Sequence, residues 1–348
     1  MNTIIGLLII AVGSFGQSSS YVPIKKVKDW AWECFWLTQG IFAWLLFPFL
    51  GALMVVPAGS SLGDILATTD AGGAMVAWKA MGFGALWGVG GLTFGLSMRY
   101  LGVAMGQSLA LGTCSAFGTL IPALLKGDNL FRGDGLILLI GVSIAIAGIA
   151  VIGYAGSLRD KNMTEEEKRK AVKDFALKKG ILIALLAGVM SACFNLGLEA
   201  GDPIKAKALA MGANELLALN PVVFLVTIGG FCTNAVFCIY NNVKNQTGKQ
   251  YFSVPGNVLT NNLLFCALAG GLWYSQFFGL GIGKFYLQDS PVMLAFSWSI
   301  LMSLNILFSN VWGILLKEWK GSGKQTITVL LIGLSILVLS IVFPQLMN

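Results

Sequence analysis

Ten long apolar runs dominate this sequence, and they decide what the chain can fold into. Each run is long enough to cross the hydrocarbon core of a bilayer as a helix, which takes about 20 residues. The runs cover 3–23, 32–56, 76–98, 101–125, 135–155, 180–200, 219–240, 257–283, 291–315 and 326–346. Only 11% of the 348 residues are charged, too few for a water-soluble surface. The predicted fold class is an all-α polytopic membrane protein with ten transmembrane helices.

The basic residues are distributed unevenly between the predicted loops. If the Lys-Lys-Val-Lys segment at 25–28 is cytoplasmic, 17 of the 23 Lys and Arg residues fall on the cytoplasmic side. Eight of them lie in the longest polar stretch, 156–179, where Thr164 and Glu167 have the spacing of a capping box. Positive charge is retained on the cytoplasmic side. Both termini are therefore predicted to lie on the outer side of the membrane.

The second half of the chain repeats the first. Residues 84–87 match 270–273 at an offset of 186, 124–126 match 315–317 at 191, and 138–141 match 330–333 at 192. Because each half has five spans, an odd number, the second copy enters the membrane inverted. The predicted domains are a first repeat over 1–156, a cytoplasmic linker with a short amphipathic helix over 157–179, and a second repeat over 180–348. Inverted repeats are typical of secondary transporters that work by alternating access.

The composition excludes several classes of function. The chain has no histidine, so Ser-His and Cys-His nucleophiles and His-ligated zinc or haem are excluded. The six cysteines lie in apolar segments without C-x-x-C spacing, and we expect buried thiols. The zinc-protease motif H-E-x-x-H and the nucleotide-binding motif G-x-x-x-x-G-K-[ST] are absent. The sequence predicts no enzyme, metal site or cofactor, and leaves a channel or a non-transporting membrane sensor as alternatives to a transporter.

The polar residues inside the predicted spans are mostly amides, hydroxyls and indoles, among them Trp36, Gln39 and Trp44 in the second span. Amides offer paired donors and acceptors and indole faces stack on C–H surfaces, so this set suits a neutral sugar. A phosphate or carboxylate ligand would instead require Arg or Lys at mid-depth. The candidate substrate-binding residues are Gln17, Tyr21, Trp87, Asn195, Trp273, Tyr274, Gln276 and Trp298.

Two carboxylates are candidates for coupling transport to an ion. Glu33 lies early in the second span and Glu199 late in the sixth. An acid within a span is a candidate carrier of a co-transported proton. The alternatives are a salt bridge with Lys26 and Lys28 for Glu33, and an exposed helix end for Glu199. The coupling ion is predicted to be a proton, with sodium as the alternative.

Several motifs resemble a known family over essentially the whole chain. They are Tyr21–Lys28, Trp30–Glu33, Leu86–Gly88, Met98–Gly102, Trp273–Phe278, Ser297-Trp298, Met302-Ser303 and Leu316–Trp319. Together they resemble the L-rhamnose-proton symporter family, which belongs to the drug/metabolite transporter superfamily. The resemblance implies two inverted five-helix halves, uptake of a deoxyhexose with a proton, and a site between the halves. The shared candidate residues that it implies are Tyr21, Glu33, Trp87, Arg99, Trp273, Gln276 and Trp298.

The chain departs from the family's pattern at a few positions. Gln17, Asn195 and Glu199 stand where smaller or neutral residues are expected, Gly91 where an Asn is expected, and Leu301 where a histidine is expected. We expect an importer of L-rhamnose or a related deoxyhexose, coupled to an ion by Glu33 or Glu199. We expect it in a bacterial cytoplasmic (inner) membrane, with both termini periplasmic. An exporter or exchanger of another small solute is the alternative. The expected partners are the sugar, the proton or sodium, and the lipid bilayer, with no nucleic acid, and the expected state is a monomer.

Overall fold

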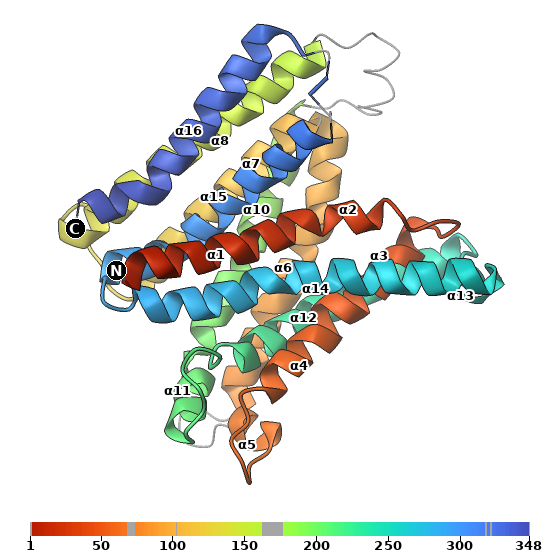
Figure 1. Ribbon diagram of the computed structural model, residues 1–348, viewed down its shortest axis with the longest axis horizontal. Helices are drawn as coiled ribbons and strands as arrows, with labels where there is room; N and C mark the ends of the chain where they lie inside the picture. Colours follow the sequence, from red (N-terminus) through yellow and green to blue (C-terminus); the bar gives the residue numbers. More distant parts are fainter. Residues whose placement is uncertain are drawn as a thin grey trace. The chain divides into compact units, whose positions relative to one another are not determined.

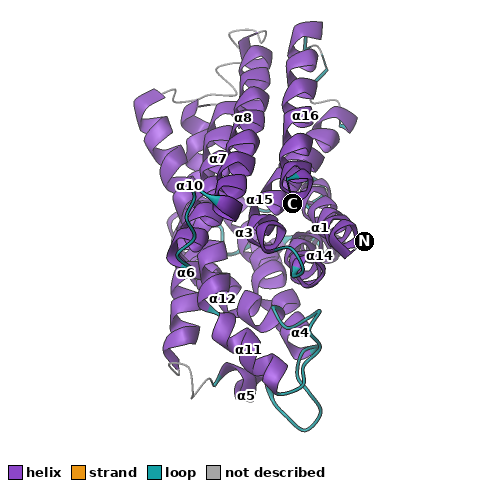
Figure 2. Cartoon of the chain, turned by 90° about the vertical axis from the view of Figure 1, so that its left-hand side faces the viewer, coloured by secondary structure: helices purple, strands orange, loops and turns teal. Residues whose placement is uncertain are grey.

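A computed structural model describes residues 2–67, 74–101, 103–161, 177–316, 319–320 and 322–347. Every regular element in these residues is a helix (Figure 1 and Figure 2). Ten helical stretches of the described residues are long and apolar enough to cross a membrane, and they coincide with the ten predicted runs to within a few residues at most ends. The predicted all-α polytopic membrane fold is confirmed.

The spans follow one another in chain order. In the first half they are α1 (Asn2–Ser19) continued by α2 (Tyr21–Ile24), α3 (Trp32–Gly40) continued by η1 (Ile41–Leu46) and α4 (Phe47–Leu53), α6 (Ala74–Leu101), α7 (Val103–Leu125) and α8 (Gly133–Lys161). In the second half they are α10 (Leu177–Ala200) extended by α11 (Asp202–Ala210), α12 (Asn220–Lys244), α14 (Gly256–Leu287), α15 (Pro291–Leu315) and α16 (Lys324–Leu346). Two short helices, α5 (Leu62–Leu66) and α13 (Gln250–Ser253), lie in connecting loops. The capping box expected at Thr164 and Glu167 lies outside the described residues.

The chain divides into two compact units that differ from the two sequence repeats. Unit 1 comprises Met1–Leu7, Val89–Leu196 and Tyr286–Asn348, and unit 2 comprises Leu8–Gly88 and Gly197–Phe285. Helices α7, α8, α15 and α16 belong to unit 1, whereas α3, η1, α4 and α12 belong to unit 2. Helices α1, α6, α10 and α14 each contribute one part to either unit. Each unit therefore combines helices from both halves of the sequence.

The core of unit 1 is formed by α8 and α16, which lie side by side (Figure 1). Ile149 and Ile152 of α8 are buried in one cluster with Leu330 and Leu337 of α16, and Ile306 of α15 joins them. These aliphatic side chains recur at helical spacing, so each helix presents an apolar stripe to its neighbour. The core contains no charged side chain among these residues and is held by packing.

Two glycines at equivalent positions of the sequence repeat bring helices together in unit 2. A methyl group on Gly84 of α6 would clash with the carbonyl oxygen of Val226 on α12. A methyl group on Gly270 of α14 would lie 2.7 Å from Cβ of Phe42 on η1. Small residues allow this close backbone approach between membrane helices. In both contacts, the third span of one half packs against the second span of the other.

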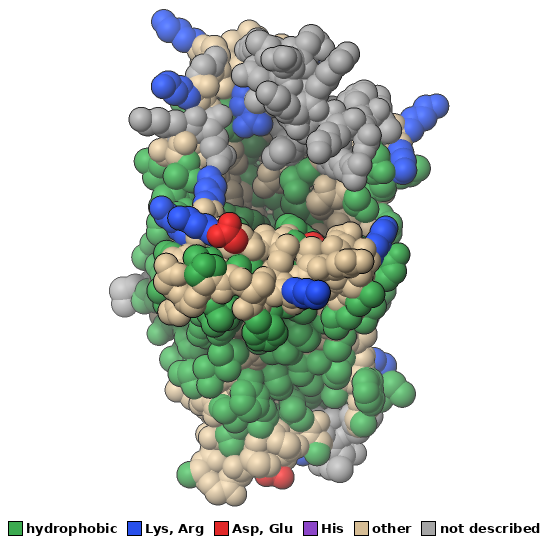
Figure 3. Space-filling model, turned by 90° about the vertical axis from the view of Figure 1, so that its right-hand side faces the viewer, with side chains coloured by type: hydrophobic (Ala, Val, Ile, Leu, Met, Phe, Trp, Pro, Cys, Tyr) green, Lys and Arg blue, Asp and Glu red, His purple; other side chains and the backbone are tan. Residues whose placement is uncertain are grey.

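The outward surface of the helices is apolar. Leu8, Val12, Leu182 and Leu264 are each more than 60% exposed, and Figure 3 shows hydrophobic side chains covering much of one face. Such exposure is unfavourable in water but is expected where side chains contact lipid. Five of the six cysteines are buried as predicted, whereas Cys232 of α12 is exposed. The prediction of a buried thiol is therefore wrong for Cys232, because that position faces outward from its helix.

Candidate substrate and coupling sites

Four tryptophans of unit 2 form a cluster, here called the tryptophan cluster. The rings of Trp87 on α6 and Trp273 on α14 have centroids 5.7 Å apart. Trp44 of η1 meets both rings edge-on, at 5.8 and 6.1 Å, and Trp36 of α3 lies 5.5 Å from Trp44. The four rings come from three different spans. The structure therefore brings together two of the predicted substrate-binding residues, Trp87 and Trp273, and adds two more indoles to them.

Trp44 occupies an irregular part of its span. The backbone changes from α-helix to π-helix over Ile41–Leu46, a rare turn that is frequent at functional sites. The ring lies over Gly40, where a methyl group would come within 2.7 Å of the ring carbons. Trp44 is only 4% exposed, and its Nε1 has no hydrogen-bond partner within the described part of the chain. Because an unpaired buried donor is costly, this N–H group is suited to bind a ligand.

Gln39 provides an acceptor one helical turn before Trp44. Gln39 is also 4% exposed, and its Oε1 is unpaired among the residues that the structure describes. The indole of Trp36 differs, since its Nε1 donates to Oδ1 of Asn234 at 2.9 Å. The N–H group of Trp36 is thus paired within the protein, whereas the Gln39 oxygen and the Trp44 N–H group remain an acceptor and a donor for a ligand. Both are polar residues of the second span, and neither is among the candidate residues predicted from the sequence. The π-helix that orients Trp44 has no sequence signature.

The remaining predicted residues of unit 2 have different surroundings. Gln276 is buried, and its Nε2 donates to the carbonyl oxygen of Trp273 at 3.1 Å. Gln17 is half-buried and accepts a hydrogen bond from the Ser18 hydroxyl at 3.4 Å. The hydroxyl of Tyr274 donates to Oδ1 of Asn220 and so joins α14 to α12. Tyr21 is 54% exposed on α2, so the structure does not bring it into a buried site.

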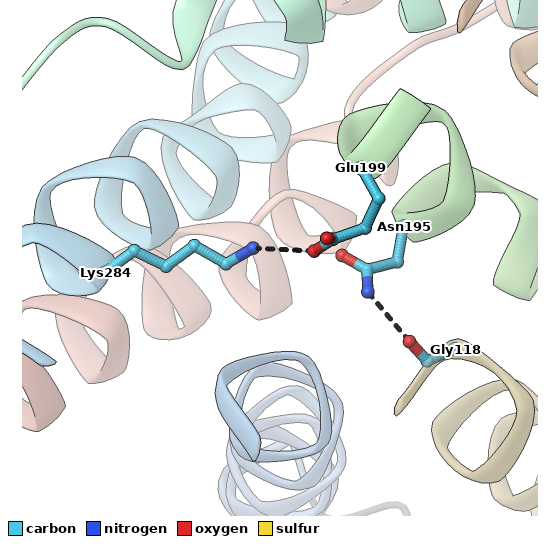
Figure 4. A network of polar contacts seen from close by, with 4 residues as sticks. All are labelled: Gly118, Asn195, Glu199 and Lys284. Atoms are coloured by element: carbon cyan, nitrogen blue, oxygen red, sulfur yellow. Dashed lines mark hydrogen bonds and ion pairs between the residues drawn. The ribbon is translucent and has the colours of Figure 1, made fainter. Parts of the chain in front are cut away.

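Asn195 and Trp298 lie in unit 1, where both contact α7. Nδ2 of Asn195 on α10 donates to the carbonyl oxygen of Gly118 at 2.7 Å (Figure 4). Trp298 of α15 stacks on Phe194 with centroids 6.1 Å apart, and its Nε1 donates to the carbonyl oxygen of Cys114 at 3.4 Å. Both side chains are buried. The structure therefore groups these two candidates with each other and assigns them to a different unit from the tryptophan cluster.

Glu33 belongs to a hydrogen-bonded network with the loop after α12. Its Oε1 accepts hydrogen bonds from Nδ2 of Asn245 at 3.0 Å and from the hydroxyl of Thr247 at 2.7 Å. In the same network, Nδ2 of Asn242 in the last turn of α12 donates to the hydroxyl of Tyr251 on α13 at 3.0 Å. Burial raises the pKa of Tyr251 to about 12, so this hydroxyl stays protonated at neutral pH. The carboxylate of Glu33 is therefore bound by the neutral donors Asn245 and Thr247. These contacts differ from the salt bridge with lysine that was the alternative prediction.

Glu199 forms an ion pair between two spans of unit 2. Its Oε1 lies 3.7 Å from Nζ of Lys284 on α14 (Figure 4). The side chains of Glu199 and Lys284 are 22% and 15% exposed, and both residues lie within candidate spans. Charges in such positions are costly unless they are paired. Glu199 is therefore a paired carboxylate on a membrane helix, and the alternative of an exposed helix end does not describe it.

Comparison with known proteins identifies the family. The family model described as L-rhamnose-proton symport protein (RhaT) matches residues 1–346. The chain belongs to the L-rhamnose-proton symport protein family. The L-rhamnose-proton symporters of Yersinia pestis (strain Pestoides F) and Yersinia pseudotuberculosis serotype O:1b (strain IP 31758) are each 33% identical over 342 residues, which is 97% of this chain and 96% of the relative. The one from Yersinia pestis bv. Antiqua (strain Antiqua) is 34% identical over 343 residues with the same coverage.

Membership in the L-rhamnose-proton symport protein family confirms the resemblance seen in the sequence motifs. The family is one of transporters, so the chain belongs to no enzyme family. The match covers both halves of the chain and all ten candidate spans. Among the candidates shared with the L-rhamnose-proton symport protein family, the side chain of Arg99 lies outside the described residues. Among the described candidates, Trp87 and Trp273 are joined by ring contact, and Gln276 bonds the backbone of Trp273.

Proposed function

We propose that this protein imports L-rhamnose together with a proton across the bacterial inner membrane. The proposal is supported by the full-length family match and by relatives named L-rhamnose-proton symporter at 33% identity over 97% of the chain. The abundance of amides and indoles in the spans, together with the scarcity of charges, agrees with a neutral sugar as substrate. Both termini face the periplasm on the distribution of Lys and Arg.

The tryptophan cluster is the proposed sugar-binding site, and it is the observation that carries the proposal. Trp87 and Trp273 offer indole faces for the C–H surfaces of a deoxyhexose. Trp44 offers an N–H group and Gln39 an oxygen that have no partner among the described residues, both on buried side chains. A sugar hydroxyl both donates and accepts hydrogen bonds, so a single ligand satisfies both groups. An apolar ligand would leave them unpaired at a cost of about 1–3 kcal/mol each.

Glu199 is the proposed coupling residue, with Lys284 as its counter-charge. When Glu199 takes up a proton, its attraction to Lys284 is lost and the pair separates. Helices α10 and α14, which carry the two residues, each contribute to both compact units. Proton binding thereby acts on helices that belong to both units. Glu33 is less suited to this role, because its carboxylate is held by neutral donors in a loop network.

The two five-span halves are proposed to form an inverted repeat that works by alternating access. The equivalent glycines Gly84 and Gly270 support this arrangement, because each brings the third span of its half against the second span of the other. Inverted repeats place substrate and ion sites where the repeats meet. The contact between Trp87 and Trp273, which are equivalent residues of the two copies, agrees with a substrate site in that region.

Uptake by the purified protein in proteoliposomes tests the proposed function. An inward proton gradient, imposed with sodium absent, is expected to drive accumulation of labelled L-rhamnose above the external concentration. A protonophore should abolish the accumulation, whereas exchange of labelled for unlabelled sugar should continue. Trp273→Ala is expected to abolish both activities, because it removes the indole that contacts both Trp44 and Trp87 in the tryptophan cluster.

Two results would change the proposed function. Accumulation driven only by a sodium gradient would replace the proton with sodium as the coupling ion. Absence of L-rhamnose accumulation, with gradient-driven movement of another solute, would assign a different substrate. A sugar panel in the same proteoliposomes distinguishes L-rhamnose from other deoxyhexoses.

A further inference from the structure

A pocket of about 100 Å³, lined by apolar and polar side chains, lies within unit 1 between α7, α8 and α15. Its floor is apolar and includes Ile149, Ile152 and Ile306 of the unit 1 core. Besides Leu111 and two glycines, the rest of the lining consists of two amides, two hydroxyls, a guanidinium and an indole. These side chains are Gln107, Ser108, Arg159, Ser309, Asn310 and Trp319. None of the six is among the proposed substrate-binding or coupling residues.

The sequence repeat relates this pocket to a closed contact in the same unit. At the offset of 191 that aligns the ends of α7 and α15, Gln107 corresponds to Trp298 and Ser309 corresponds to Gly118. The Trp298 indole packs so closely on Gly118 that a methyl group there would clash with it. At the equivalent place, Gln107 and Ser309 both line the pocket. One copy of the contact is therefore filled by an indole, and the other is open and lined by an amide and a hydroxyl.

The chemistry of the walls favours a neutral polyhydroxylated ligand. Nδ2 of Asn310 donates to the carbonyl oxygen of Ile306 at 2.9 Å, and its Oδ1 is an acceptor for a ligand hydroxyl. The guanidinium carbon of Arg159 lies 5.1 Å from the centroid of the Trp319 ring. An anion site usually gathers several charged or backbone donors. Among the described lining residues Arg159 alone is charged, and the amides and hydroxyls match sugar recognition.

We infer that this pocket is a second sugar subsite, which receives the sugar at the cytoplasmic side during release. The assignment rests on the proposed function, since the topology predicted from Lys and Arg puts the end of α8 and the end of α15 in the cytoplasm. In alternating access by an inverted repeat, a contact in one copy opens the path to one side of the membrane while the equivalent contact in the other copy stays closed. The open pocket at Gln107 and the filled contact at Trp298 are such a pair. The pocket gives the departing sugar hydrogen-bond partners before water replaces them.

The test compares sugar affinity from the two faces of the membrane. In inside-out vesicles, Asn310→Leu is expected to raise the half-saturation concentration of L-rhamnose about fivefold, as for the loss of one neutral hydrogen bond. In right-side-out vesicles the half-saturation concentration should not change. Asn241→Leu is the matched control, because Nδ2 of Asn241 bonds the carbonyl oxygen of Phe237 in the same i−4 geometry outside the pocket. It should leave both values unchanged.

A second variant distinguishes a local effect on the pocket from a loss of the folded structure. Gln107→Trp introduces the indole found at the equivalent position of the other copy and should raise half-saturation at the cytoplasmic face alone. The inference is overturned if Asn310→Leu and Gln107→Trp shift both faces equally or neither face, while the wild-type protein transports L-rhamnose. It is also overturned if these variants lose only a bound anionic lipid, detected by native mass spectrometry. Absence of wild-type uptake instead overturns the proposed function itself, and the inference falls with it.

Discussion

Trp87 and Trp273 face each other with ring centroids 5.7 Å apart, although 186 residues separate them in the sequence. This separation equals the offset between the two copies of the repeat in these spans. In an inverted repeat, equivalent residues can meet only near the axis that relates the copies. Substrate sites of such transporters lie in that region. The contact therefore connects the repeat, which is a sequence pattern, with the proposed sugar-binding site.

Two tryptophans of the cluster should respond oppositely to loss of the indole N–H group. Trp44→Phe removes a donor that has no partner among the described residues, so it should weaken L-rhamnose binding about fivefold and leave the unfolding midpoint unchanged or higher. Trp36→Phe leaves Oδ1 of Asn234 without its donor and should lower the free energy of unfolding by about 1–3 kcal/mol. Calorimetric titration with L-rhamnose and thermal unfolding in detergent measure both. Unchanged sugar affinity in Trp44→Phe would contradict the assignment.

The equivalent glycines of α6 and α14 should both be intolerant of a methyl group. Gly84→Ala places Cβ against the Val226 carbonyl and Gly270→Ala places it against Phe42, so each should lower the unfolding midpoint by several degrees. Gly82→Ala is the control on the same helix, because a Cβ there meets nothing within 4 Å. It should be neutral or slightly stabilising, since alanine favours the helix. Similar midpoints for Gly82→Ala and Gly84→Ala would argue against the close approach of α6 and α12.

Glu33 is expected to stabilise the loop after α12 and to take no part in coupling. Glu33→Gln keeps an oxygen that can accept from Asn245 and Thr247, so it should retain gradient-driven accumulation. Glu33→Leu removes the acceptor and should cost about 1–3 kcal/mol of stability. Accumulation per folded protein and thermal unfolding measure the two effects. A stable Glu33→Gln variant that exchanges sugar but no longer accumulates it would instead assign the coupling role to Glu33.

The sequence predicts the spans well and the site only in part, for physical reasons. Hydropathy over about 20 residues is a strong signal, so the sequence predicts all ten spans. The repeat also indicates Trp87 and Trp273 as equivalent residues, although it does not predict that their rings are in contact. The orientation of a single side chain depends on local backbone geometry, which the π-helix at Trp44 alters without a sequence signature. The sequence does not distinguish Tyr274 from a ligand-binding aromatic, because its partner Asn220 lies 54 residues away on another span. The partners of Glu33 are more than 200 residues away in the sequence, and no pattern within the second span indicates them.

Proton coupling should depend on the ion pair between Glu199 and Lys284. Glu199→Gln cannot exchange a proton, so it should abolish accumulation driven by a pH gradient while sparing exchange of labelled for unlabelled L-rhamnose. Lys284→Met removes the counter-charge 3.7 Å away and should change the pH dependence of accumulation, because the protonation equilibrium of Glu199 then lacks its cationic neighbour. Asp289→Asn is the control, since this carboxylate lies beyond the end of α14 and accepts a hydrogen bond from Asn2. It should leave accumulation and its pH profile intact. If Glu199→Gln still concentrates the sugar, the proton is carried elsewhere, and the ion pair serves only to join α10 and α14.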